Sequence, residues 1–255
     1  MALFIDGIPS TLVELRSYEN GVLAVASTED IDVTGKARIA KERLASELLL
    51  FLRRNSSKDL LWALTARVTV DDVVVTDPLK RWHAYETLSL IYQDAYNNQL
   101  NDRYLGKWTE YDQLSTAAAL TLFQVGIGVV RNPVPKANGP ALIIGGGVGV
   151  GTSYYLSVAW VNSTGEEGQS SDIQQASNEG TTAMQVTVAD APKNITGWNL
   201  YAGVSPDALA LQNATPMAIT EPWTASATGL ASGRRPSNGQ LPDYWIIDHR
   251  AIARG

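Results

Sequence analysis

The chain has 255 residues, of which 45% are hydrophobic and 18% are charged, a globular composition long enough for one large domain or two of medium size. It contains no cysteine, which excludes disulfides, thiol catalysis and thiolate metal sites and fits a chain made in a reducing cytoplasm. The net charge of −6 argues against a dedicated nucleic-acid-binding protein, because phosphate neutralisation needs an excess of lysine and arginine.

The first part of the chain shows the apolar periodicity of helices. Thr11 followed three residues later by Glu14 matches a capping box, and apolar side chains recur at threes and fours over residues 12–25. We therefore predict one helix of about four turns here, weakened by Gly21 in its middle. A second helix is predicted over residues 36–54. The N-terminus has no basic flank before a long apolar core, so we expect no signal peptide.

The next stretch, "RVTVDDVVVT" at residues 67–76, is β-branched and alternating, and it predicts either a short strand or an extended linker. Asp77 and Pro78 then form a helix start, a capping carboxylate followed by proline at the first helical position. The third predicted helix reaches about residue 98. A fourth is predicted over residues 102–125, which gives a bundle of about four helices.

The fourth predicted helix carries a stripe of side chains at a mean spacing of 3.5 residues. Such a stripe is most often part of a core, and otherwise faces a partner. We expect its first three aromatic residues to be divided between the core and a contact with a neighbouring subunit. The stripe consists of Tyr104, Trp108, Tyr111, Ser115, Ala118, Leu122 and Val125.

Composition changes near residues 133–140. Residues 1–136 carry 15 basic and 17 acidic side chains, whereas residues 137–255 carry 5 and 9 and are rich in glycine, serine, threonine and asparagine. A domain boundary is therefore predicted, with a helical assembly domain over residues 1–136 and a linker rich in glycine and proline over residues 137–151.

Residues 141–161, "ALIIGGGVGVGTSYYLSVAWV", contain no charge. A membrane helix of this length would have five glycines within seven positions, each costing about 1 kcal/mol relative to alanine. A dinucleotide-binding loop would need a helix after the glycines, but an alternating strand pattern follows them instead. We interpret the stretch as a flexible glycine linker that leads into a strand, and we expect no membrane span.

Further alternating segments follow at intervals of about ten residues, separated by polar turns. They include "AMQVTVAD", "ITGWNLYAG" and "PMAITEPWTA". This spacing predicts an antiparallel β-sandwich over residues 152–240, with a core of tyrosine, tryptophan and aliphatic side chains.

The last segment, "LPDYWIIDHRAIARG" at residues 241–255, is an apolar cluster followed by arginines. It is either the last strand of the sandwich or an arm that docks on a neighbouring subunit, because aromatic and arginine side chains anchor interfaces. The candidate interface residues in this segment are Tyr244, Trp245, Ile246, Arg250 and Arg254.

The side chains with reactive chemistry form no recognisable catalytic pattern. Asp30 and Asp32 open a partial calcium loop, but Lys41 stands where a bidentate glutamate is required, so we read these carboxylates as the start of the following helix. His83 and His249 are the only histidines, too few for a typical zinc site. We predict no catalytic residue, no metal and no cofactor.

Two resemblances cover most of the chain. "YYLSVAWVNSTGEEGQSS" (154–171) and "TGWNLYAG" (196–203) resemble strands of fibronectin type III or immunoglobulin-like domains, although the strand whose sequence looks late in such domains comes first here. Residues 12–52, 79–114 and 125–137 resemble the head–tail connector, or adaptor, proteins of tailed phages.

The resemblance implies an α+β multidomain chain, a helical bundle followed by an Ig/FnIII-like sandwich. It implies a structural virion protein, assembled in the host cytoplasm, that forms a ring of twelve copies below the portal protein. Tail, tail-terminator or nozzle proteins would be its other partners, and DNA would pass through the ring without sequence-specific binding.

Two alternatives remain open. The first is a binding module, a sandwich that recognises a glycan or a host surface on a helical oligomerisation stem. The second is an enzyme of unknown type. Exposed coplanar aromatic side chains on the sandwich would favour the binding module, and a cleft with converging polar groups would favour the enzyme.

Overall fold

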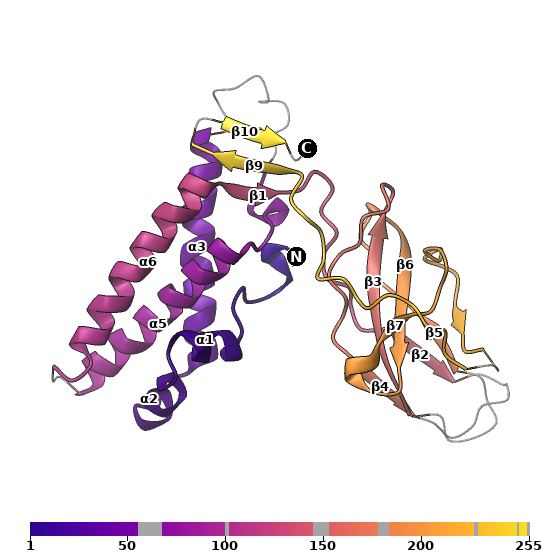
Figure 1. The fold of residues 1–255 in the computed structure, drawn as a ribbon, viewed down its shortest axis with the longest axis horizontal. Helices are drawn as coiled ribbons and strands as arrows, with labels where there is room; N and C mark the ends of the chain where they lie inside the picture. Colours follow the sequence, from indigo (N-terminus) through magenta and orange to yellow (C-terminus); the bar gives the residue numbers. More distant parts are fainter. Residues whose placement is uncertain are drawn as a thin grey trace. The chain divides into compact units, whose positions relative to one another are not determined.

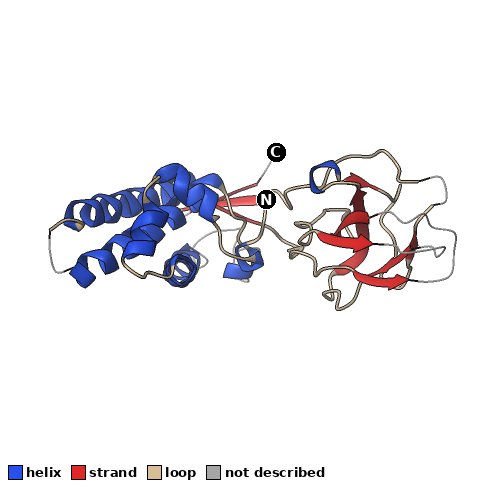
Figure 2. Ribbon diagram, turned by 90° about the horizontal axis from the view of Figure 1, so that it is seen from below, coloured by secondary structure: helices blue, strands red, loops and turns tan. Residues whose placement is uncertain are grey.

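The protein is described here by a computed structural model that covers residues 1–55, 68–99, 102–144, 153–177, 184–226, 229–248 and 250–253. The chain forms two compact units, and each unit is built from two separate segments of the sequence. The helical unit comprises residues 7–131 and 242–255, and the β unit comprises residues 1–6 and 132–241. Figure 2 shows that the helices gather in one unit and most of the strands in the other.

Five α-helices lie in the described part of the helical unit (Figure 1), and a 3₁₀ turn, Val70–Asp72, precedes the fourth of them. The two longest helices, α3 and α5, run for 23 residues each, close to the predicted second and third helices. The helices are α1 (Leu12–Tyr18), α2 (Val22–Thr28), α3 (Val33–Asn55), α5 (Asp77–Gln99) and α6 (Leu105–Val125).

The first predicted helix is in fact two short helices. The capping box is confirmed, because the Glu14 amide donates to the Thr11 hydroxyl and the Thr11 amide donates to the Glu14 carboxylate. The break follows Tyr18, where Glu19 is extended and its carboxylate accepts from the Gly21 amide at 3.3 Å. A glycine with a local acceptor at this point favours ending one helix and starting another over continuing a single one.

The core of the helical unit lies between α2, α5 and α6. Leu15 and Val22 from the N-terminal helices pack with Leu88 and Ile91 of α5, and all four are buried. Tyrosines of α5 and α6 complete this cluster. Asp32, in the segment that partly matches a calcium loop, directly precedes α3 as predicted, and its carbonyl accepts from the Lys36 amide.

A three-stranded antiparallel sheet closes one end of the helical unit, with strand order β1-β9-β10. Gly126, at φ 112°, turns the chain from α6 into β1, and a Cβ there would lie 2.7 Å from Ile247. The C-terminal segment was expected as the last strand of the sandwich or as an arm that docks on a neighbouring subunit, but it forms a hairpin in the helical unit instead. The strands are β1 (Ile127–Val129), β9 (Tyr244–Ile247) and β10 (Arg250–Ala253).

The β unit contains two antiparallel sheets, one with strand order β2-β5-β8 and one with strand order β4-β3-β6-β7. The longest pair is β3 and β6, in which Trp160 lies directly opposite Trp198. A 3₁₀ turn, Pro206–Ala208, lies between β6 and β7. The strands are β2 (Ala141–Ile144), β3 (Ser153–Asn162), β4 (Gln174–Ser177), β5 (Met184–Thr187), β6 (Ile195–Gly203), β7 (Ala210–Leu211) and β8 (Trp223–Thr224).

One core cluster joins the two sheets of the β unit, with Trp160 and Trp198 fully buried beside Met184 and Val186. The predicted strand in the uncharged stretch is confirmed as β3. Part of the predicted linker, Ala141–Ile144, is instead strand β2, because its residues pair with β5. The five glycines of the stretch lie outside the described residues.

The N-terminal segment Met1–Asp6 was predicted within the helical domain, but it belongs to the β unit, where a 3₁₀ turn (Phe4–Asp6) ends it. The Asp6 carboxylate accepts a 2.7 Å hydrogen bond from the Lys136 amide, so this segment is fixed to the chain that enters the unit. No helix in the described ranges is long and apolar enough to cross a membrane.

Candidate assembly surfaces

The aromatic stripe of α6 packs mainly inside the helical unit. Tyr104 and Tyr111 are buried, and their rings lie beside Tyr92 with centroid distances of 6.1 and 5.6 Å. Trp108 is only partly buried and stacks on Tyr96. Of the three aromatic residues predicted as a shared core and subunit contact, Trp108 is therefore the one with a ring at the surface.

Both buried tyrosine hydroxyls donate to glutamates of the N-terminal region. The Tyr104 hydroxyl donates to Glu29 at 3.0 Å, and the Tyr111 hydroxyl donates to Glu19 at 2.8 Å. Burial alone would raise the pKa of Glu19, but hydrogen bonds from Tyr111 and Lys107 lower that pKa below its ordinary value. Burial and the bond to Glu19 raise the pKa of Tyr111. These residues connect α6 to the N-terminal helices and are not free for an outside partner.

The predicted C-terminal cluster lies at the other end of α6. Ile246 is buried opposite Ile127 of β1, and Tyr244 is partly buried with the guanidinium of Arg131 4.7 Å from its ring centre. Trp245 is also partly buried, and Arg250 pairs with Ile247 in the hairpin. Arg254 and His249 lie outside the described residues.

The structure does not bring the two predicted sets together. Tyr111 and Val125 are separated by 14 positions of one helix, roughly 20 Å along its axis. The N-terminal aromatic residues of α6 therefore belong to one end of the helical unit, and the C-terminal hairpin belongs to the other.

An apolar groove lies beside the hairpin, at the ends of α3 and α6. Its volume is about 500 Å³. Phe51 and Phe123 stack within it at a centroid distance of 4.6 Å, and Trp82 meets Phe123 edge-on. The groove is lined by Glu47, Leu50, Phe51, Arg54, Leu120, Phe123, Gln124, Ile247 and Asp248.

Two leucines that line the groove are exposed to solvent. Leu50 is 54% exposed and Leu120 is 58% exposed. The sequence analysis did not single out either residue. A signal was present for Leu50, because the apolar run Leu48–Leu52 is too wide for one buried helix face. Leu120 lies outside the buried stripe of α6, so the pattern predicted no core contact for its side chain.

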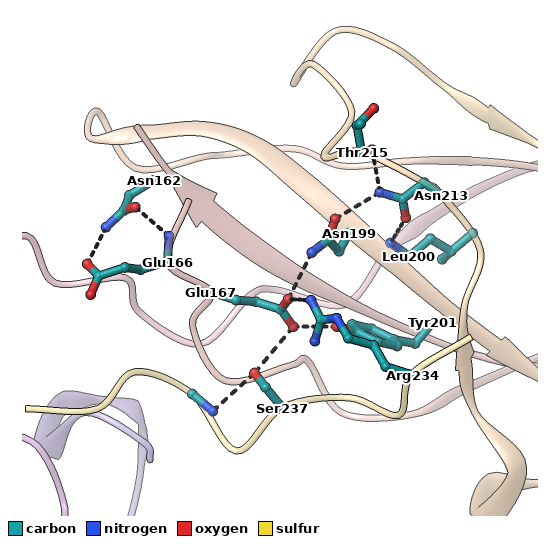
Figure 3. Close-up of polar contacts among 11 residues, drawn as sticks. Asn162, Glu166, Glu167, Asn199, Leu200, Tyr201, Asn213, Thr215, Arg234 and Ser237 are labelled. Atoms are coloured by element: carbon teal, nitrogen blue, oxygen red, sulfur yellow. Dashed lines mark hydrogen bonds and ion pairs between the residues drawn. The ribbon is translucent and has the colours of Figure 1, made fainter. Parts of the chain in front are cut away.

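A polar network of the β unit surrounds Glu167, whose side chain is almost completely buried (Figure 3). Its carboxylate accepts hydrogen bonds from the Asn199 amide at 2.8 Å and from the Tyr201 hydroxyl at 2.6 Å. Arg234 forms an ion pair with it, and Ser237 adds a longer bond at 3.3 Å. The carboxylate therefore connects the loop after β3 to β6 and to the segment that leaves the unit.

No protein-family model matches this sequence, and no curated protein is significantly similar to it. In both units, buried carboxylates of the described part of the chain accept hydrogen bonds from tyrosine hydroxyls. The groove beside the hairpin is an apolar hollow that is open to solvent.

His83 is fully buried between helices and has a structural role. Its Nε2 lies 2.9 Å from the Ala37 carbonyl, which can only accept, so Nε2 carries the proton and Nδ1 accepts from the Ser10 hydroxyl at 2.6 Å. Burial lowers the pKa of His83 to about 4. Within the described ranges, no three histidine, aspartate or glutamate side chains are grouped so that they could hold a metal ion.

Proposed function

We propose that this chain is a structural, non-catalytic virion protein, a head–tail connector of a tailed phage. In this proposal twelve copies form a ring below the portal protein, DNA passes through the ring, and tail proteins bind its far side. The helical unit makes the subunit contacts. The β unit is an immunoglobulin-like sandwich that decorates the ring.

The exposed groove is the observation that carries this proposal. Monomeric proteins rarely leave a contiguous apolar hollow open to water, and such hollows mark binding surfaces. This one is built from α3, α6 and β9, with stacked phenylalanines between exposed leucines. An apolar, aromatic surface with a charged rim has the composition of a protein–protein interface.

The buried polar side chains support a structural role. Glu19, Glu29 and Glu167 each accept from tyrosine hydroxyls, and His83 is held between a serine and a backbone carbonyl. A general base needs access to a substrate proton, whereas these groups face neighbouring elements of the fold. Their arrangement favours a scaffold over an enzyme.

The strand order supports the immunoglobulin-like assignment. The order β4-β3-β6-β7 corresponds to strands C′, C, F and G, and the β2–β5 pair corresponds to strands B and E. Trp160 on β3 then occupies strand C, where immunoglobulin domains bury a tryptophan. Strand β8 pairs with β5, as strand D pairs with strand E, although β8 follows β7 in the sequence.

The experiment is a measurement of mass and shape in solution, alone and after co-expression with a portal protein. The expected result is a discrete ring in negative-stain images, or incorporation of this chain into portal particles. A chain that stays monomeric at high concentration and is absent from portal particles contradicts the proposal.

A polar hollow in the β unit favours one second candidate, a glycan-binding module. It has a volume of about 390 Å³ and includes the side chains of Asp6, Lys136, Asn138 and Asp172. Among the described residues that line it there is no aromatic side chain, and stacking aromatics would be needed to hold a sugar ring firmly. Specific retention on a glycan array, lost in Asn138→Ala, would favour this function over the connector.

A further inference from the structure

We infer that the groove holds helix α1 of a second copy of this chain, so that subunits join head to tail. This inference rests on the proposed ring assembly and names the surfaces that form it. The two surfaces lie on different elements of the helical unit: α1 carries the inserted ridge, and α3, α6 and β9 form the groove. In Figure 1, α1 lies away from the end of the unit where α3 and α6 meet β9.

The ridge is the solvent-facing side of α1. Val13 is 76% exposed and Leu12 is 46% exposed, and Arg16 is exposed on the same side of the helix. At 100° per residue, these three side chains fall within about one third of the helix circumference, and the buried Leu15 lies about 110° from the middle of this arc. Two neighbouring apolar side chains with an arginine beside them form the kind of anchor that interfaces use.

The ridge is held rigidly in place. The Thr11 capping box fixes the start of α1, and Lys80 of α5 forms an ion pair with Glu14 at 3.0 Å. Ser10, just before the helix, bonds to the buried His83. A ridge fixed before association loses little conformational freedom on binding, which favours affinity.

The groove matches the ridge in size and in charge. Its volume of about 500 Å³ can take two aliphatic side chains together with part of the helix that carries them. The rim carries Glu47, Asp248 and Arg54, a net charge of −1. Glu14 is already engaged by Lys80, so Arg16 is the charge that α1 presents outward, and it is opposite in sign to the rim.

A contact between two different surfaces of one chain is heterologous, and repeated heterologous contacts close into a ring when the rotation allows it. A groove that bound another groove would give only a two-fold dimer. The ridge-and-groove pairing therefore provides the type of contact that a connector ring requires.

The test uses two exposed positions, so that folding is preserved. Val13→Asp breaks the ridge and leaves the groove, and Leu120→Asp breaks the groove and leaves the ridge. Each variant alone is expected to associate at least about tenfold more weakly than the wild type. An equimolar mixture is expected to form 1:1 heterodimers and nothing larger, because only one intact ridge and one intact groove remain. Analytical ultracentrifugation measures both effects.

Charge reversal gives an independent readout. Arg16→Glu is expected to weaken association, and Glu47→Arg combined with it is expected to restore part of the loss. Val204→Asp, at a position 67% exposed in the β unit, is the matched control and should associate like the wild type. Circular dichroism melts check that every variant remains folded.

Several outcomes overturn the inference while leaving the ring proposal intact. Rings that form normally with Val13→Asp would exclude the ridge. Loss of portal binding in Leu120→Asp with unchanged self-association would assign the groove to the portal protein. A mixture of the two variants that gives no heterodimer would exclude head-to-tail pairing. If the wild type forms no assembly alone or with portal, the proposed function itself fails.

Discussion

The two units share one kind of buried polar contact and differ in their centres. In both, a carboxylate accepts from a tyrosine hydroxyl: Glu19 from Tyr111 in the helical unit, and Glu167 from Tyr201 in the β unit. The helical unit also holds His83 between its helices, whereas the β unit fills its centre with Trp160 and Trp198. We therefore expect the stability of the helical unit to depend on the protonation state of His83, and that of the β unit to depend on filled volume at its centre.

The surfaces differ as well. The groove of the helical unit is apolar, whereas the hollow in the β unit includes the polar or charged side chains of Asp6, Lys136, Asn138 and Asp172. Association is therefore expected through the helices.

Deleting residues 242–255 is expected to have the largest effect. These residues follow the β unit in sequence, yet β9 pairs with β1 and buries Ile246 in the helical unit. The deletion should remove hydrogen-exchange protection from α5 and α6 and leave β3 and β6 protected. Loss of protection in the β unit instead would contradict the division into units.

Trp198→Ala is expected to cost about 3–5 kcal/mol of unfolding free energy. The side chain is fully buried, and its Nε1 donates to the Ala218 carbonyl at 3.0 Å. Calorimetry should show the loss in the transition of the β unit alone. Trp223→Ala, in the short strand β8 and only partly buried, is the matched control, and an equal loss there would show that the core is not centred on Trp198.

Lowering the pH from 6.5 to 4 is expected to destabilise the helical unit by about 3 kcal/mol. The pKa of His83 is lowered from 6.5 to about 4 by burial, so over this window the unfolded chain binds a proton that the folded chain does not. The contribution of neutral His83 to the free energy of unfolding is fully present above pH 6.5, and it is lost as the pH falls towards 4. Urea melts of the wild type and His83→Gln measure it, and an unchanged pH slope in the variant would refute it.

Removing one tyrosine hydroxyl from each unit is expected to have the smallest effect. Tyr111→Phe leaves Glu19 with fewer donors and should cost about 1–2 kcal/mol. Tyr201→Phe should cost less, because Glu167 keeps bonds from Asn199 and Ser237 and its ion pair with Arg234. Denaturant titrations compare the two, and a larger loss for Tyr201→Phe would reverse this order.

Local signals in the sequence were sufficient for the long helices and for the central strand of the β unit. Asp77 and Pro78 mark the start of α5, and the alternation after residue 152 marks β3. The break at Glu19 escaped prediction because a periodic apolar face continues across it. The side-chain bond that ends α1 leaves no mark in such a pattern.

Features that depend on distant pairing could not be predicted. Ile246 pairs with Ile127, 119 positions earlier in the sequence, and neither segment carries a signal for the other. The groove needs the ends of α3, α6 and β9 together, so none of the three sequences shows it alone. Tyr104 and Tyr111 were recognised as a stripe, but their glutamate partners lie in the first thirty residues and were not foreseen.

The position of the C-terminal hairpin also sets the order of synthesis events. The ribosome synthesises the helices α1 to α6 first, and then residues 132–241 of the β unit. Strands β9 and β10, which complete the sheet of the helical unit, are synthesised last. During synthesis of the β unit, β1 of the helical unit has no β9 with which to pair. The sheet of the helical unit can therefore be completed only after the β unit has been synthesised.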